Sequence, residues 1–417
     1  MANDSSTPTR RRMLLAGGAT AAGAVGAGAM AGVDHALRAD ATAPPAADPL
    51  PGTIPFHGAH QSGIATRHTS RAAFLALDLH RHTDREAIIR MLRLITQDAA
   101  RLTQGATPIA GQEAELAAQP HRLTVTFGFG PELVDRAGMP TPSWLKPLPA
   151  FGIDRLQERF SDGDLLLQVA ADDALPVAHA VRMLLKDLRS FARVRWIQNG
   201  FRDAAPVTPE PGTTGSMRNL FGQVDGSANA LPDTDGFDRI VWIPDGPWSG
   251  GTSLVLRRIA MDLDTWDELD RGGREKAIGR RLDSGAPLTG TKETDSPDFT
   301  AADEKGFPVI PEFSHLRRAR GERTGDRAGE PRQEILRRSY NYDDPPSPED
   351  MADGALSRSG LIFAAYQRDV DAQYIPIQKR LDHLDLLNTW TTPIGSAVFA
   401  IPPGCGEGEF IGQSLLE

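Results

Sequence analysis

Residues 164–200 read DLLLQVAADDALPVAHAVRMLLKDLRSFARVRWIQNG, and this stretch decides the fold. It opens with a short apolar run, continues with apolar residues spaced by threes and fours, and closes with a second strand-like run. These patterns predict a strand at residues 164–171, an amphipathic helix, and a strand at residues 192–200. Asp172 or Asp173 is placed to cap the start of the helix.

The chain before this stretch supplies three matching elements. Residues 71–79 alternate like a strand, Asp84 starts a helix with one apolar stripe, and residues 123–129 form a strand rich in β-branched residues. The combined order is β-α-β-β-α-β, which is the ferredoxin-like arrangement with an antiparallel sheet.

A looser copy of the same order follows. Its predicted strands are residues 240–243, 253–260, 334–340, 360–367 and 396–401, and its predicted helices are residues 264–270 and 375–388. Residues 283–330 are rich in Gly, Asp, Arg and Thr, so we expect an irregular excursion there. The predicted fold is therefore α+β, with two ferredoxin-like modules at residues 54–205 and 216–417 in the manner of a dimeric α+β barrel.

The N-terminus carries an export pattern. Residues 9–14 read T-R-R-R-M-L, which matches the twin-arginine pattern, and the Ala/Gly stretch that follows is too short and too weakly hydrophobic for a stable membrane span. We predict a twin-arginine signal peptide at residues 1–41 and a linker at residues 42–53. The twin-arginine export machinery would then deliver the folded protein, with its cofactor, to the periplasm, the cell envelope or the extracellular space.

Composition excludes several classes of protein. The chain has 417 residues and a net charge of −10, so nucleic-acid binding, which needs a positive footprint, is disfavoured. The single cysteine, Cys405, permits neither a disulfide within the chain nor a zinc or iron–sulfur site made of several thiolates.

A glycine-rich stretch presents an acid. Residues 221–229 read F-G-Q-V-D-G-S-A-N, with Asp225 between two glycines in a G-x-x-D-G motif. Such glycines let the backbone approach a flat ligand and leave the Asp225 carboxylate projecting from a tight bend. An Asx turn without chemistry is the alternative reading of this motif.

Further along the chain, His315 and an arginine pair are candidates for the same site. A neutral imidazole is a good ligand for iron, although a structural histidine is the plainer interpretation of His315. Arg337 and Arg338 end a predicted strand, and because adjacent strand residues point to opposite faces, one of them should face inward. A buried arginine needs an anionic partner, whereas a surface pair would make only salt bridges.

Asp385 falls on or beside the apolar face of the predicted helix at residues 375–388. A carboxylate in that place needs a hydrogen-bond partner, and a histidine that binds a metal commonly gives its second N–H to such an acid. A half-solvated aspartate at the boundary of the helix is the alternative.

Taken in order, these motifs resemble the dye-decolorizing peroxidase family. The G-x-x-D-G motif, the His315-Leu316-Arg317 segment and the L-R-R-S-Y run at residues 336–340 carry the resemblance. Supporting segments are residues 56–64, 278–280, 360–367 and 410–413. The resemblance covers most of the chain, but the family's usual Asn-Pro-Arg after the histidine is replaced by R-A-R-G-E at residues 318–322.

The resemblance implies one haem b per chain and a peroxidase that reduces hydrogen peroxide while it oxidises dyes, phenols or other small organic donors. It makes His315 the proximal ligand of the haem iron, with Asp385 hydrogen-bonded to its ring. It makes Asp225 and Arg338 the catalytic pair on the distal face. The residues expected to lie against the haem are Gly226, Ser227 and Ala228.

Two other functions stay open on the sequence alone. One is a haem-handling protein that releases iron or delivers haem with little turnover. The other is a binding module without haem on a ferredoxin-like scaffold, since a fold does not fix a function. A homo-oligomer is compatible with all three.

Overall fold

The computed structural model describes residues 52–109, 111–203, 215–321, 333–352 and 354–417. The predicted signal peptide and nearly all of the predicted linker lie outside these residues. Within them, nine strands form one sheet in which every pairing is antiparallel. No helix in this part of the chain is long and apolar enough to cross a membrane.

The first half of the chain follows the predicted element order. Its main elements are β1 (Arg71–Leu79), α1 (Arg85–Thr103), β2 (Thr124–Phe129), β3 (Leu165–Ala171), α4 (Ala174–Leu188) and β4 (Ala192–Phe201). Asp84 caps α1 by accepting from the Ala87 N–H, and Asp173 rather than Asp172 caps α4 by accepting from the Leu175 N–H. The four strands lie in the order β2-β3-β1-β4.

The second half repeats that strand order. Its long strands are β7 (Thr252–Met261), β9 (Tyr340–Asp344), β10 (Arg358–Gln367) and β11 (Thr391–Ile401), which lie in the order β11-β7-β10-β9. The short strands are β5 (Met217–Arg218), β6 (Val224–Asp225) and β8 (Leu336–Arg337). The helices here that position the site are α7 (Arg271–Ile278), α8 (His315–Arg320) and α10 (Ile375–Leu384).

The remaining short elements cover edges and loops. They are α2 (Ala114–Ala117), α3 (Pro131–Ala137), a 3₁₀ helix (Glu158–Phe160), α5 (Asp235–Val241), α6 (Leu263–Asp267), α9 (Pro348–Ala352), a π-helix (Val370–Tyr374), a second 3₁₀ helix (Leu386–Thr389) and α11 (Gln413–Leu416).

One predicted strand is wrong, and several other predicted elements differ from the structure in their bounds. The predicted strand at residues 240–243 is instead the end of α5, which buries Phe237, Ile240 and Val241 from one helical face. The predicted strand at residues 334–340 is divided into β8 and β9, although both pair with β10 in one continuous register and the Arg338 N–H between them donates to the Ala364 carbonyl at 2.8 Å. The predicted helix at residues 375–388 ends at Leu384, because Asp385 caps the 3₁₀ helix that follows.

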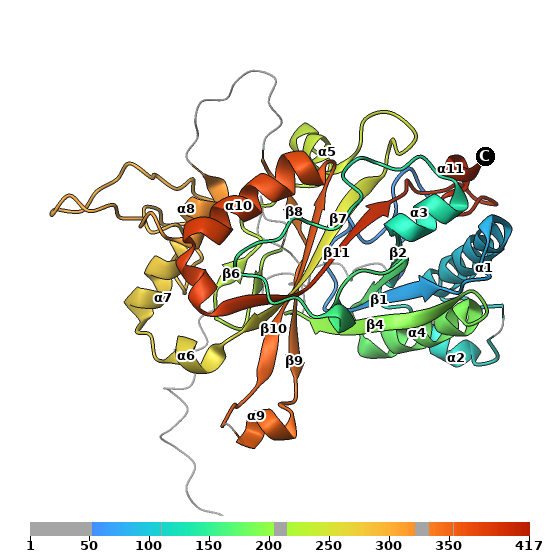
Figure 1. The fold of residues 1–417 in the computed structure, drawn as a ribbon, viewed down its shortest axis with the longest axis horizontal. Coiled ribbons are helices and arrows are strands. Elements are labelled where there is room, and N and C mark those ends of the chain that lie inside the picture. The colour runs from blue at the N-terminus through green and yellow to red at the C-terminus, as the bar shows by residue number, and fades with distance from the viewer. Residues whose placement is uncertain (1–51, 110, 204–214, 322–332, 353) are drawn as a thin grey trace, which may run out of the picture. The chain divides into compact units, whose positions relative to one another are not determined.

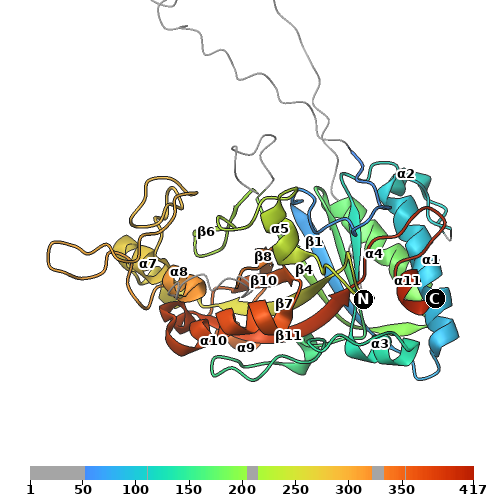
Figure 2. The same cartoon turned by 90° about the horizontal axis from the view of Figure 1, so that it is seen from above.

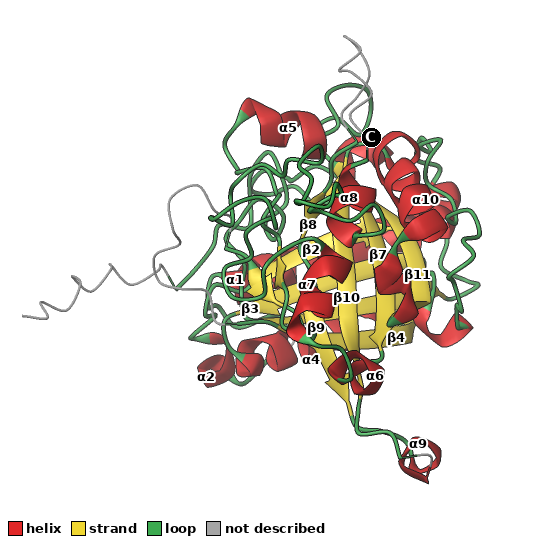
Figure 3. Ribbon diagram, turned by 90° about the vertical axis from the view of Figure 1, so that its left-hand side faces the viewer, coloured by secondary structure: helices red, strands yellow, loops and turns green. Residues whose placement is uncertain are grey.

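The two sets of four strands close into a ring. The pairs Phe201↔Asn341 and Ala400↔Phe129 join β4 to β9 and β11 to β2. Helices α1 and α4 flank the sheet at the end opposite to α7, α8 and α10 (Figures 1 and 2). Figure 3 shows the strands crossing behind α7 and α8. Residues from both halves share the same hydrophobic core, for example Phe74 of β1 with Leu254 of β7.

Candidate functional site

An imidazole is held by a buried acid at the meeting of two helices. His315 is the first residue of α8, which packs against α10, and Asp385 directly follows α10. The His315 Nδ1 lies 2.6 Å from the Asp385 Oδ2. The Asp385 side chain is only 3% exposed while that of His315 is 30% exposed, so the acid is enclosed and the ring keeps an open edge. The predicted pairing of these two residues is what the structure shows.

Asp385 is fixed on its other side as well. Its Oδ1 accepts from the Leu387 N–H at 3.0 Å, and the neighbouring Leu386 N–H donates to the Phe313 carbonyl at 2.9 Å. Burial by itself lowers the pKa of His315, but the charge and hydrogen bond of Asp385 outweigh it, so the pKa of the imidazole is raised. The acid therefore makes the ring a stronger base than burial alone would allow.

The G-x-x-D-G stretch forms a bend that presents its acid to an arginine. Gly222 and Gly226 both have positive φ, at +78° and +100°, which non-glycine residues rarely adopt. Between them Asp225 ends β6, and its Oδ1 lies 2.7 Å from the Arg337 Nη1. Their side chains are 12% and 25% exposed, so this ion pair is largely shielded from water.

The ion-pair partner of Asp225 is thus Arg337, whereas the expected partner was Arg338. Arg338 is 4% exposed, and its Nη1 donates to the Thr66 carbonyl at 2.6 Å. The two arginines take opposite sides because they are adjacent in an extended segment. The alternation predicted that they would separate, but not which of them would meet the acid.

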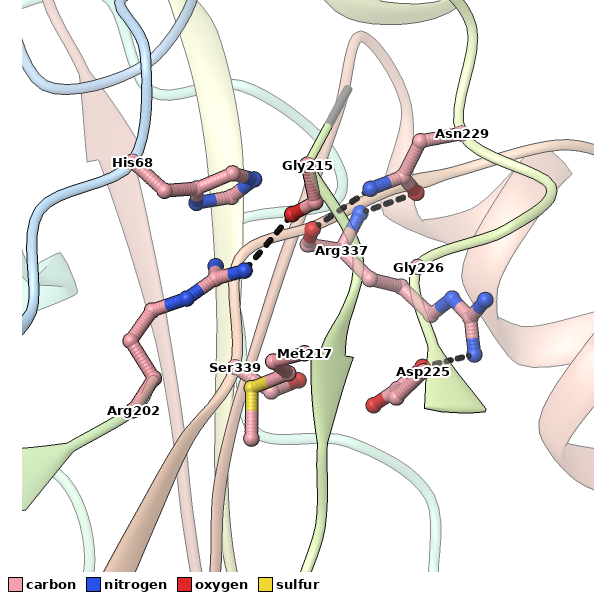
Figure 4. A pocket seen from close by; sticks show the side chains of 9 residues that line it. All are labelled: His68, Arg202, Gly215, Met217, Asp225, Gly226, Asn229, Arg337 and Ser339. Atoms are coloured by element: carbon pink, nitrogen blue, oxygen red, sulfur yellow. Dashed lines mark hydrogen bonds and ion pairs between the residues drawn. The ribbon is translucent and has the colours of Figure 1, made fainter. Parts of the chain in front are cut away.

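Asn229, which the sequence analysis did not single out, holds Arg337 against the bend. Its Nδ2 donates to the Arg337 carbonyl at 2.8 Å, and its Oδ1 accepts from the Arg337 N–H at 3.0 Å (Figure 4). The side-chain amide copies the pairing that a neighbouring strand would make. Its only signal in the sequence was a residue able to both donate and accept, four positions after the acid.

The other expected contacts are partly enclosed. Gly226 and Ser227 are half-buried, and Ala228 is exposed. The Ser227 Oγ is buried without a hydrogen-bond partner among the described residues. A polar atom left in that condition is rare in a folded protein and indicates a missing ligand or water.

The charges of the Asp225–Arg337 pair act on the His315 imidazole. Asp225 and Arg337 both act on the protonation of His315, with opposite signs. Arg280, which is 6% exposed, is close enough to Arg337 and Arg320 that their charges, after burial, lower its pKa to about 10. The site therefore has an imidazole with an open edge, a carboxylate paired with a guanidinium, and further basic side chains.

Comparison with known proteins identifies the family. The N-terminal model of Dyp-type peroxidases matches residues 61–202, and the C-terminal model matches residues 216–406. The chain belongs to the dye-decolorizing peroxidase family. As a Dyp-type peroxidase it is a haem-dependent enzyme with an α+β fold.

Several relatives span most of the chain. A dye-decolorizing peroxidase of Thermobifida fusca is 38% identical over 92% of this chain and 86% of its own length. A deferrochelatase of Yersinia pestis is 31% identical over 99% of this chain and 95% of its own length.

Solved structures agree. A DyP-type peroxidase from Cellulomonas bogoriensis is 52% identical, with a TM-score of 0.81 over 88% of this chain and 98% of that one. The ferric form of DtpA from Streptomyces lividans is 37% identical, with a TM-score of 0.80 over the same shares.

The residues of this Dyp-type peroxidase fit a haem. The His315 Nε2 makes no hydrogen bond to any described residue, so it is available to a metal. At Gly226 an added Cβ would be in ordinary van der Waals contact with Ser216, at 3.6 Å, and it is the positive φ of +100° that favours glycine there. Arg280 and Arg337 place two positive charges near each other, which suits a group that carries carboxylates.

Proposed function

We propose that His315 would hold the haem iron through its ring nitrogen and that Asp225 and Arg337 would act on hydrogen peroxide. The observation that carries this proposal is the pair of couples His315–Asp385 and Asp225–Arg337, which lie within electrostatic range of each other. Asp385 would orient the imidazole and increase its basicity. Gly226, Ser227 and Ala228 would line the haem.

When bound, the haem supplies the iron that takes two oxidising equivalents from peroxide and returns them to donors. Asp225 would accept a proton from one oxygen of hydrogen peroxide and return it to the other oxygen, which leaves as water. Arg337 stabilises the negative charge that grows on the departing oxygen. Asn229 keeps the guanidinium in place through both of its backbone bonds.

The test compares the two arginines. Arg337→Ala should keep the Soret absorption and slow the reaction with peroxide by roughly 10²–10³, because one preorganised charge-stabilising donor is worth that much. Arg338→Ala should lower the stability of the fold and change the peroxide step far less. The measurement is stopped-flow absorbance after mixing with one equivalent of peroxide. A slow Arg338→Ala variant beside an unaffected Arg337→Ala variant would return the role to Arg338.

We propose haem b, one per chain, as the cofactor, and dyes, phenols or similar one-electron donors as reductants. The Thermobifida fusca relative, named a dye-decolorizing peroxidase, supports the choice of donor. Pyridine haemochrome analysis against protein concentration checks both the type and the number of haems.

The deferrochelatase relatives favour a second function, in which the protein removes iron from haem. Steady-state oxidation of a dye by peroxide separates the two. A peroxidase turns over many dye molecules per haem and keeps its iron, whereas an iron-releasing protein yields free iron and porphyrin with little dye oxidation.

For the architecture, we propose two ferredoxin-like modules, at residues 54–205 and 216–417. The matching strand orders β2-β3-β1-β4 and β11-β7-β10-β9 support this division. The sequence between the modules includes residues 204–214, which lie outside the described residues. Association of copies of the chain into a homo-oligomer is compatible with this division, and size-exclusion chromatography with light scattering measures it.

We propose further that residues 1–41 direct export by the twin-arginine route and are then removed, with residues 42–53 as a linker. Replacing Arg10 and Arg11 by lysine should retain the protein in the cytoplasm with its haem in place, because the route carries folded proteins. Cell fractionation with haem absorbance measures this outcome. Export of the double lysine variant at the level of the wild type would refute the assignment.

A further inference from the structure

Two buried guanidinium groups beside the site have no carboxylate partner. Arg202 is 8% exposed, and its Nη2 donates to the Gly215 carbonyl at 2.6 Å. Arg338 is 4% exposed and bonds the Thr66 carbonyl. The Nε of each lacks a hydrogen-bond partner, and neither forms an ion pair with any described residue. Arginine stays charged in proteins, so buried guanidinium groups normally require an anion.

A buried imidazole lines the same pocket as Arg202. His68 is 5% exposed and its Nδ1 has no hydrogen-bond partner among the described residues. Burial, and then the charges of Arg338, Arg202 and Arg122, hold the pKa of His68 well below its usual range. The lowered pKa shows that burial and the arginines around His68 disfavour a charge on its ring. The neutral ring can still donate one N–H to an acceptor.

Arg202 and His68, but not Arg338, line a pocket that adjoins the bend of Asp225. The lining residues are His68, Arg202, Gly215, Met217, Asp225, Gly226, Asn229, Arg337 and Ser339. Figure 4 shows the His68 ring and the Arg202 guanidinium together on one side, and Asp225 with Arg337 on the other. The Ser339 Oγ is also buried without a partner. The carboxylate in the lining is already paired with Arg337, so the charge of Arg202 is left without a contact partner.

We propose that this pocket binds a small planar monoanion through Arg202, with His68 and Ser339 as further donors. A guanidinium matches the two oxygens of a carboxylate or a nitrate, and a shielded site strengthens the bond. The anion has two sources of the same chemistry: a carboxylate of the bound haem, or a free anion from solution. The inference extends the proposed site but does not depend on peroxidase turnover.

The experiment uses the full-length haem-loaded protein and nitrate as the probe. Melting midpoints are measured against nitrate concentration at constant ionic strength, balanced with the bulky anion of morpholinoethanesulfonate, for wild type, Arg202→Gln and Arg193→Gln. Arg193 lies on the adjoining strand β4 and its side chain is 74% exposed, so it is the matched control. In parallel, the rate of haem transfer to excess apomyoglobin is measured by absorbance.

If the pocket binds a free anion, nitrate should raise the melting midpoint of the wild type and of Arg193→Gln. Arg202→Gln should then weaken the apparent affinity for nitrate about tenfold or more, as loss of a charged hydrogen bond does. A haem carboxylate predicts no nitrate effect on wild type and a faster haem loss, by about tenfold, from Arg202→Gln only.

Two outcomes overturn the proposal. One is wild-type protein indifferent to nitrate together with unchanged haem loss from Arg202→Gln. The other is a nitrate effect that persists undiminished in Arg202→Gln, which would place the anion elsewhere. If Arg202→Gln does not fold, His68→Phe replaces it in both arms with the same expectations. The proposed peroxidase function is scored separately, by the Soret change with peroxide.

Discussion

At the scale of single residues, the site depends on which neighbour each charged group meets. One carboxylate oxygen of Asp385 bonds the His315 ring, and the other accepts from the Leu387 N–H. Asp385 is therefore both the partner of the imidazole and the cap of the 3₁₀ helix at Leu386–Thr389. Its environment leaves it almost no contact with water. Substitutions of Asp385 should therefore affect two separate properties, the basicity of the His315 ring and the stability of the local fold.

Asp385→Asn should separate the two. The amide keeps an oxygen for the Leu387 N–H but loses the negative charge, so His315 becomes a weaker donor to iron. We expect the reduction potential of the haem to rise, while stability falls less than in Asp385→Ala, which also loses a cap worth about 1 kcal/mol. Spectroelectrochemistry and urea unfolding measure the two effects. An unchanged potential in Asp385→Asn would count against the role given to this acid.

At the scale of elements, the contacts that decide function occur where regular structure stops. Arg337 is the last residue of β8, and its side chain meets Asp225, which is the last residue of β6. In the first half of the chain, α1 and α4 pack together, with Asp98 of α1 buried and Asp187 of α4 half-buried beside it. These two carboxylates make that helix contact sensitive to pH.

Burial and then the neighbouring Asp98 raise the pKa of Asp187 to about 7. In the unfolded chain the pKa of an aspartate is about 3.9. Because the folded state binds the proton more tightly, the stability from this group is complete below pH 4 and is lost as pH rises through about 7.

Asp187→Asn should therefore be more stable than wild type at pH 8, and the difference should vanish at pH 4. Urea unfolding at several pH values measures this, with exposed Asp135→Asn as the control. Equal pH dependence of the Asp187→Asn and wild-type proteins would contradict the expectation.

At the scale of the whole molecule, the two halves are joined by strand pairing and by a shared core. Phe74 of β1 is fully buried, packs its ring edge-on against Tyr340 at 6.0 Å, and belongs to the same cluster as Leu254 of β7. A substitution that disturbs the packing of one half within this cluster should therefore also destabilise the other half. Cooperative unfolding of both halves together is the expected behaviour.

Phe74→Ala should lower the free energy of unfolding by about 3–5 kcal/mol, as deletion of a buried phenylalanine does. It should do so through one transition, with far-UV circular dichroism and Soret absorbance falling at the same temperature. Calorimetry and both spectra measure this. Two separate transitions, with haem released at only one of them, would show that the halves unfold independently.

The sequence predicted the first half well, because its strands and helices have strong periodicity and clear caps such as Asp84. It failed at residues 240–243, where a short apolar run fits a helix or a strand equally and tertiary packing decides. It indicated His315 and Asp385, which the structure brings together, and it paired Asp225 with Arg338, whereas the ion pair forms with Arg337. Alternation along a strand separates two adjacent arginines but does not say which of them faces the acid.

The length of α10 determines where the Asp385 carboxylate lies relative to the His315 ring. The distance from the buried acid to the imidazole is set by how many residues the helix contains before Asp385. One inserted residue within α10 would swing the carboxylate around the axis by about 100° and move it along by about 1.5 Å. Among natural variants of this chain, point changes on the outer side of α10 should be common, and changes of its length should coincide with loss of the acid–imidazole couple.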